Sequence, residues 1–460
     1  MSQFENNLSE GSVARRLIVF ALPVLLSNII QSLYSVADML IVGNFAGTAS
    51  MSAVNIGGQV TFIITNIVFG LCLGGTVLIA QYLGAGEREK MRRTISTLVT
   101  GLLILSIFCT VGMLFFRDAS LRLIRTPEES FAEASEYLFV TILGIVFIFG
   151  YNALSAILRG MGDSKRPFYF VLIACVTNII LDIVFVGPMH MGARGAAIAT
   201  VISQGLSMLL CVAYLARNKF IFDFKLRSYR IYKEQLGLIF KIGTPNAIQN
   251  GVVSISFMFI TTLVNVIGGY TASAAVGVVG KFNGFALMPA LAMSAAISTM
   301  SAQNIGAGKW DRAVKSLRIG TVIAVVISYS IFAVAQAFPE FILRLFDRDP
   351  EMIAYGVSYM RSFSFDYLLV PICFCFNGLY MGSGHTTFTL INGILSSLLF
   401  RIPASYLFGV VLDWGLFGVG LGGPVASLGA LILIIVFYFT GRWKVNVVHH
   451  ITNTASDQAA

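Results

Sequence analysis

The chain has 460 residues, of which 57% are hydrophobic and only 12% charged, and its mean hydropathy is +0.82. A soluble domain cannot bury that much apolar surface inside itself, so the composition excludes a soluble protein and indicates a membrane protein. The apolar runs are about 20 residues long, the length of a transmembrane helix, and do not have the alternating pattern of a membrane β-barrel.

Stretches without Asp, Glu, Lys or Arg predict an all-α polytopic protein with twelve transmembrane helices. The longest stretches contain more than one helix each, and we expect them to divide at glycine-rich turns, Gly43 to Gly47 and Gly268-Gly269. In chain order the predicted spans are 16–42, 53–82, 94–116, 132–157, 166–187, 194–216, 236–265, 275–303, 314–338, 354–380, 387–410 and 416–440.

The formal net charge is +9, so the position of the basic residues matters. With twelve spans, 22 of the 31 Lys and Arg fall at the two termini and in the loops on the same side, and seven fall in the opposite loops. The positive-inside rule then places both termini in the cytoplasm of a multi-pass protein of the cell membrane. The basic excess is a topology signal, so we expect membrane lipid around the protein and no nucleic-acid partner.

The first half of the sequence recurs in the second half at a constant offset of 222 residues, which pairs Pro23 with Pro245 and Asn28 with Asn250. By the last span of each half, the offset is 223. The repeat predicts two six-helix lobes, 1–222 and 223–460. Because six is an even number, the lobes have the same orientation and are related by a pseudo-twofold axis along the membrane normal.

Motifs for catalysis are missing from the sequence. It contains no HExxH and no GxSxG, and the glycines at 418, 420 and 423 fit a dinucleotide motif only formally, because no strand precedes them. We therefore expect no enzyme activity and no cofactor.

Two acidic residues interrupt the apolar spans, where each costs at least ~2.5 kcal/mol to insert and is a functional hypothesis by default. Asp38 ends a polar stripe on the first predicted helix, and Asp182 follows Asn178 by one turn. The stripe also contains Asn28, Gln31, Tyr34 and Ser35. If the two helices are neighbours, the paired carboxylates must bind a proton or a hard cation such as Na⁺. The alternative is that each acid lies near a helix end and faces water.

The second copy lacks these acids. The positions equivalent to Tyr34, Asp38, Asn178 and Asp182 are Ser256, Ile260, Phe400 and Ala404. This asymmetry places ion coupling in the N-terminal lobe. Three other ionisable residues inside predicted spans are candidates for lining a substrate cavity: Lys281, Asp366 and Arg401.

Together these features resemble the multidrug and toxic compound extrusion (MATE) transporters, in particular the bacterial DinF-like branch. The resemblance covers nearly the whole chain. It rests on Pro23, Gln31-x-x-Tyr34-x-x-x-Asp38, Gln81-Tyr-Leu-Gly84-Ala-Gly86, Arg159-Gly160-Met-Gly162-Asp163, Asn178-x-x-x-Asp182 and Thr200.

The resemblance implies a monomeric antiporter that exports small amphipathic, cationic compounds in exchange for Na⁺ or H⁺ by alternating access. It implies that the transported cation is bound by Asp38, Asn178, Asp182 and Thr200, which would be the ligands of a sodium ion. It places Tyr34, Gln31 and Asn152 nearby, and it makes Pro23 the position where the first helix bends.

Two other functions stay open. A flippase for lipid-linked substrates would need a cavity lined by several basic residues, and a non-transporting membrane scaffold would not need buried acids. The sequence leaves the choice between sodium and protons open, because both use the same oxygen ligands.

Overall fold

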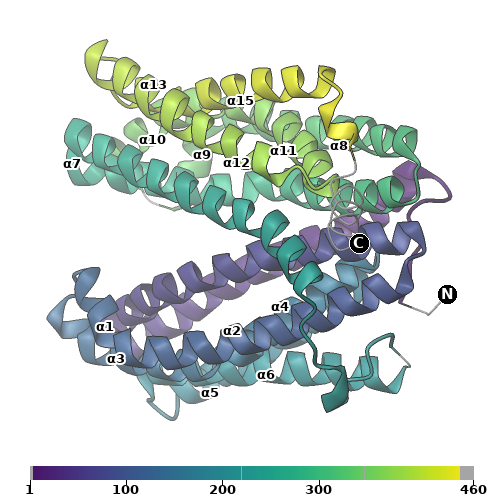
Figure 1. The fold of residues 1–460 in the computed structure, drawn as a ribbon. Helices are drawn as coiled ribbons and strands as arrows, with labels where there is room; N and C mark the ends of the chain where they lie inside the picture. Colours follow the sequence, from purple (N-terminus) through teal and green to yellow (C-terminus); the bar gives the residue numbers. More distant parts are fainter. Residues whose placement is uncertain (1–3, 219, 347, 446–460) are drawn as a thin grey trace. The chain divides into compact units, whose positions relative to one another are not determined.

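The computed structural model describes residues 4–218, 220–346 and 348–445, and the regular elements in these residues are all helices (Figure 1). The two longest are α1 (Val13–Ala85) and α7 (Lys233–Gly306), each of which contains two predicted spans. They are broken at Gly47, where φ is 85°, and at Gly269, where φ is 61°. Glycine adopts positive φ without steric cost. Both predicted division points are therefore confirmed.

Five further helices lie between α1 and α7: α2 (Arg88–Leu123), α3 (Glu128–Leu143), α4 (Ile145–Gly160), α5 (Lys165–Val186) and α6 (Gly192–Arg217). The predicted span 132–157 is formed by α3 and α4 together, which are bent by 49° at Gly144. A short 3₁₀ turn (Leu226–Ser228) lies in the segment that leads to α7.

The second half continues with α8 (Trp310–Ala337), α9 (Pro339–Arg344), α10 (Pro350–Phe363), α11 (Asp366–Gly382), α12 (Thr386–Ile394), α13 (Ile402–Tyr406), α14 (Gly415–Gly420), α15 (Gly422–Phe439) and a 3₁₀ turn (Arg442–Lys444). Two π-helical segments, Leu395–Arg401 and Leu407–Val411, connect α12, α13 and the loop before α14. The pair α10 and α11 is bent by 49°. The short helix α9 was not predicted.

Eight of these helices are long and apolar enough to cross a membrane, and the count is ten when each bent pair is one span. Because α1 and α7 each contain a break near their middle, each supplies two spans. Over the described residues this gives about twelve spans, so the predicted all-helical membrane fold is confirmed.

The chain divides into two compact units, which are described separately here. Unit 1 contains Leu26–Thr244 and the short N-terminal segment before Leu8; unit 2 contains Leu8–Leu25 and the described residues from Pro245 onward. In unit 1, α6 packs against α3, α4 and α5. In unit 2, α11 packs against α8 and α15.

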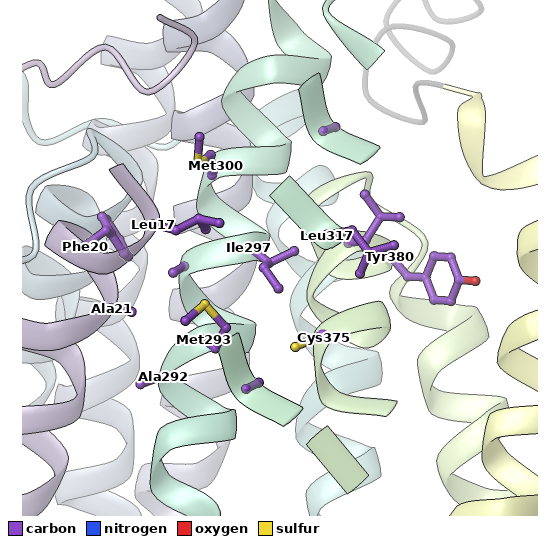
Figure 2. Packing of buried hydrophobic residues seen from close by; sticks show 14 of the residues in the cluster. Leu17, Phe20, Ala21, Ala292, Met293, Ile297, Met300, Leu317, Cys375 and Tyr380 are labelled. Carbon is purple, nitrogen blue, oxygen red and sulfur yellow. The ribbon is translucent and has the colours of Figure 1, made fainter. Parts of the chain in front are cut away.

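The first part of α1 belongs to the core of unit 2. Leu17 and Ala21 lie in the same buried cluster as Ala292 and Ala296, together with the residues labelled in Figure 2. Small residues at these positions permit close packing of helices, as is common in membrane proteins.

The repeat-equivalent contact occurs in unit 1 at the start of α7. A Cβ atom on Gly243 would lie 2.6 Å from the carbonyl oxygen of Gly70, and one on Gly74 would lie 2.5 Å from that of Ile239. These residues are the 222-residue equivalents of the four in unit 2. Each unit is thus completed by the first turns of a helix that continues into the other.

Candidate ion-coupling site

Three helices of unit 1 bring the predicted acidic pair together. Asp38 lies on α1 and Asp182 on α5, and their exposed fractions are only 7% and 0%. Their carboxyl groups form a hydrogen bond with each other. Such a bond needs a proton on one of the two acids, because two touching carboxylates repel each other strongly in a low-dielectric site.

Asn178 and Thr200 link the acid pair to α6. The hydrogen-bond network fixes the orientation of the Asn178 amide, whose nitrogen donates to Asp182 Oδ2 at 2.6 Å. Its oxygen accepts the backbone N–H of Thr200 at 3.1 Å. The hydroxyl of Thr200 in turn lies 3.0 Å from that of Tyr34 on α1. The five side chains predicted for coupling therefore form one connected polar cluster.

The cluster has oxygen atoms that are available for a ligand. Within the described residues, Asp38 Oδ1 and Asp182 Oδ1 are buried and have no hydrogen-bond partner. Leaving such atoms unpaired in an apolar environment costs ~1–3 kcal/mol each or more. Carboxylate, amide and hydroxyl oxygens are ligands that a hard cation prefers, so the donor set fits Na⁺ as well as a proton.

No basic side chain compensates the acid pair. The charged group that interacts with Asp38 is Asp182, and in the described part of the chain no Lys or Arg contributes at either acid. An ion must therefore supply the positive charge whenever both acids lose their protons. This makes the pair sensitive to the concentration of a small cation.

A cavity of about 220 Å³ reaches this cluster from within unit 1. Its polar lining residues are Gln31, Tyr34, Thr65, Tyr151, Asn152, Asn178, Ser203 and Gln204. Drug-sized ligands occupy pockets of ~300–1,000 Å³, so this cavity suits water and a small ion better than a drug. Gln31 and Asn152, which were predicted as substrate-cavity residues, line this ion-sized cavity.

The other predicted cavity residues lie elsewhere. Asn28 is half-buried on α1, about one turn before Gln31. Asp366 and Arg401 belong to unit 2, where their opposite charges interact. Arg401 also donates to Ser256 Oγ at 3.3 Å, and its guanidinium lies 4.7 Å from the centre of the Phe257 ring. The acid of unit 2 is thus partly neutralised within the protein.

Tyr137 on α3 is a site residue that the sequence reasoning missed. It is buried, with an exposed fraction of 6%, and it interacts electrostatically with both Asp38 and Asp182. The repeat held a signal for it, because the offset of 222 pairs Tyr137 with Tyr359. Tyr359 has the corresponding position in unit 2, where it interacts with Arg401 and Asp366.

Comparison with known families decides the identity of the fold. The sequence model of the MatE family matches the chain twice, at residues 23–184 and 245–407. The chain belongs to the MATE family. The two matches begin 222 residues apart and end 223 residues apart, as the internal repeat does. This chain is a MATE-family multidrug efflux transporter with a multi-pass membrane fold, and it is not an enzyme.

The similarity to other MATE proteins covers almost the full length. The chain is 30% identical over 438 residues to the probable multidrug resistance protein YpnP of Bacillus subtilis, covering 95% of this chain and 97% of that protein. It is 27% identical over 461 residues to the probable multidrug resistance protein NorM of Thermotoga maritima, covering 97% of both chains.

Solved MATE structures have the same fold. One is a multidrug resistance MATE transporter of the MOP superfamily in an outward-facing conformation, with a TM-score of 0.88 and 24% identity over 96% of this chain and 98% of that chain. A second is a MATE protein in a bent conformation, with a TM-score of 0.87 and 25% identity over 98% of both chains.

Proposed function

We propose that the protein exports small amphipathic, cationic organic compounds in exchange for Na⁺ or H⁺, and that Asp38 and Asp182 bind the coupling ion. The observation that carries this proposal is the buried, hydrogen-bonded acid pair without a basic partner. The relatives named as multidrug resistance proteins support the substrate class.

The coupling follows from charge balance at the pair. When an ion or proton is bound, the site is nearly neutral and is tolerated in a closed, dry environment. When it is released, the second negative charge favours a conformation in which water reaches the acids. The ion gradient therefore shifts the population of conformations, since a ligand moves an equilibrium by its differential affinity for the two states.

Asn178 and Thr200 determine how the acid pair is presented. In the sodium-coupled version, the ion is held by oxygens of Asp38, Asp182, Asn178 and Thr200. In the proton-coupled version, Asn178 and Thr200 orient the carboxyl that keeps the proton. The cavity next to Tyr34 gives water and ions a route to the pair.

The side of the membrane and the finer family branch are part of the proposal. We place both termini in the cytoplasm, because basic residues concentrate in the loops on that side. We assign the chain to the DinF-like branch on its motifs around Asp38 and Asp182, and we expect a monomer. We also propose that α1 bends near Pro23, which lies inside the helix and is compatible with a kink. The bent conformation of a related MATE protein supports this.

The decisive experiment is efflux of a fluorescent cationic dye from proteoliposomes, with a sodium gradient or a pH gradient imposed alone. Wild-type protein should transport the dye under one gradient, and Asp38→Asn should abolish this transport. Asp311→Asn, which changes an exposed acid at the start of α8, is the matched control and should behave as wild type. Absence of wild-type transport under both gradients would overturn the antiport proposal.

A further inference from the structure

A second pocket, of about 330 Å³, lies at the end of unit 1 where α2 and α7 begin. It is formed by the early turns of α2 and by the segment 220–232 that precedes α7. Its lining residues are Arg92, Arg93, Ser96, Ile221, Phe222, Asp223, Arg227, Ser228, Arg230 and Tyr232. None of these residues takes part in the ion-coupling site.

Hydrogen bonds to α2 hold the walls of this pocket in place. Ser96 Oγ lies 2.6 Å from the carbonyl oxygen of Ser228 and accepts the N–H of Arg230 at 3.0 Å. The N–H of Tyr232 donates to Thr97 Oγ1 at 3.1 Å. Phe222 packs edge-on against Tyr229. The pocket is therefore preformed, and a ligand does not need to order the segment on binding.

The pocket has an excess of positive charge, with four arginines against one aspartate. Arg92 and Arg93 share Glu89, at 3.0 and 3.1 Å. In the described part of the chain, no carboxylate pairs with Arg227 or Arg230, both of which are exposed. A hydrogen bond from Ser228 lowers the pKa of Asp223, so this acid is ionised at neutral pH and already occupied. Two guanidinium groups are thus available for an anion.

The location of the pocket indicates which anion it binds. The charge-free stretch of α2 begins directly after Arg93, so the arginines lie where a membrane span ends. Beside them, the side chain of Leu226 is 92% exposed. An exposed leucine next to arginines at a span end matches the interface between acyl chains and phosphate headgroups.

We propose that this pocket binds the phosphate headgroup of an anionic phospholipid, with Arg227 and Arg230 contacting the phosphate and Leu226 inserting among the acyl chains. Guanidinium groups bind phosphate oxygens through paired hydrogen bonds. Under the proposed topology, the lipid belongs to the cytoplasmic leaflet. A lipid bound here fixes the position of α2 against the start of α7.

The test uses the purified full-length protein and measures retained lipid by native mass spectrometry, with phosphatidylglycerol, phosphatidylcholine and inorganic phosphate as probes. We expect wild-type protein to prefer phosphatidylglycerol. The double variant Arg227→Gln, Arg230→Gln should bind it about 30-fold more weakly, the value for two arginines at a membrane surface. The control double variant Arg122→Gln, Arg194→Gln removes the same charge from exposed positions at the opposite ends of α2 and α6 and should bind as wild type.

Two further variants keep the test independent of folding. Arg227→Lys, Arg230→Lys preserves the charge and should recover most of the binding, and Leu226→Ser should weaken phosphatidylglycerol binding while leaving dye efflux measurable. Equal retention of both lipids by wild-type protein would overturn the proposal. So would displacement of phosphatidylglycerol by millimolar inorganic phosphate, because the site would then recognise a free anion without its lipid.

Discussion

The hydroxyl groups of Tyr34 and Thr200 lie 3.0 Å apart, although 166 positions separate the two residues in sequence. This contact joins α1 to α6 next to the acid pair, and Tyr34 also lines the small cavity of unit 1. It links the route by which an ion enters to the residues that bind it.

Tyr34→Phe should therefore weaken binding of the coupling ion without unfolding the protein. The ring remains, and only one hydrogen bond is lost, which is worth ~0.5–1.5 kcal/mol. We expect the ion concentration for half-maximal transport to rise by about two- to tenfold. Tyr406→Phe, at an exposed position of unit 2, is the control. An unchanged ion dependence would show that this contact has no role in coupling.

Asp38 and Asp182 should act as a unit. Asp38→Asn and Asp182→Asn remove the same shared site, so each single variant should reduce gradient-driven efflux to the level of protein-free liposomes. The double variant should be no worse than either, since groups that act together are not additive. Partial activity in each single variant, with further loss in the double, would indicate two independent sites.

The opposite charges of Arg401 and Asp366 should stabilise unit 2. Removing one partner leaves a buried charge without compensation, so Asp366→Asn should lower the free energy of unfolding by about 2 kcal/mol. Adding Arg401→Met should restore part of this loss, because both charges are then gone. Denaturant titration in detergent measures the cycle. A fully additive double variant would show that the two side chains are uncoupled.

Gly243 should tolerate no larger side chain. A Cβ at this position would lie 2.6 Å from a backbone oxygen, so Gly243→Ala should destabilise the protein by ~1–3 kcal/mol. Gly237 is the matched control on the same helix, because no atom lies within 4 Å of the place that a Cβ would occupy there. Gly237→Ala should be neutral or stabilise the helix by ~0.5–1 kcal/mol. Thermal melting of both variants gives the comparison.

His385, in the turn between α11 and α12, should make stability depend on pH. Burial lowers the pKa of its imidazole below the ordinary value of 6.5. The unfolded chain therefore binds a proton that the folded chain does not, and stability falls as the pH drops below about 6.5. We expect His385→Gln to lose less in melting temperature than wild type between about pH 7.5 and pH 5.5. An identical loss in both proteins would assign the effect to other groups.

Hydropathy, charge and the repeat predicted most of the fold. They locate the breaks at Gly47 and Gly269, because a glycine-rich turn inside an apolar run leaves a local signature. The bend at Gly144 gave no such signal, since one apolar run continues through it. The unpredicted helix α9 is short and lies outside the apolar spans.

The site was predicted as far as intramembrane charge reveals it. Asp38 and Asp182 are conspicuous because an acid in an apolar span is expensive. Tyr137 is not, because a tyrosine in a membrane span has many structural uses. The pairing of Arg401 with Asp366 also depends on how helices pack, which spacing along the chain does not encode.

The exchange of helix segments between the units has a consequence for biosynthesis. Residues 8–25 leave the ribosome early, yet their packing partners, such as Ala292 and Leu317, are made far later. Unit 1 likewise lacks its last piece until Thr244 has been synthesised. The first helix must therefore wait in the bilayer, and a gene split at codon 222 would yield two fragments that each need the other to fill their own interiors.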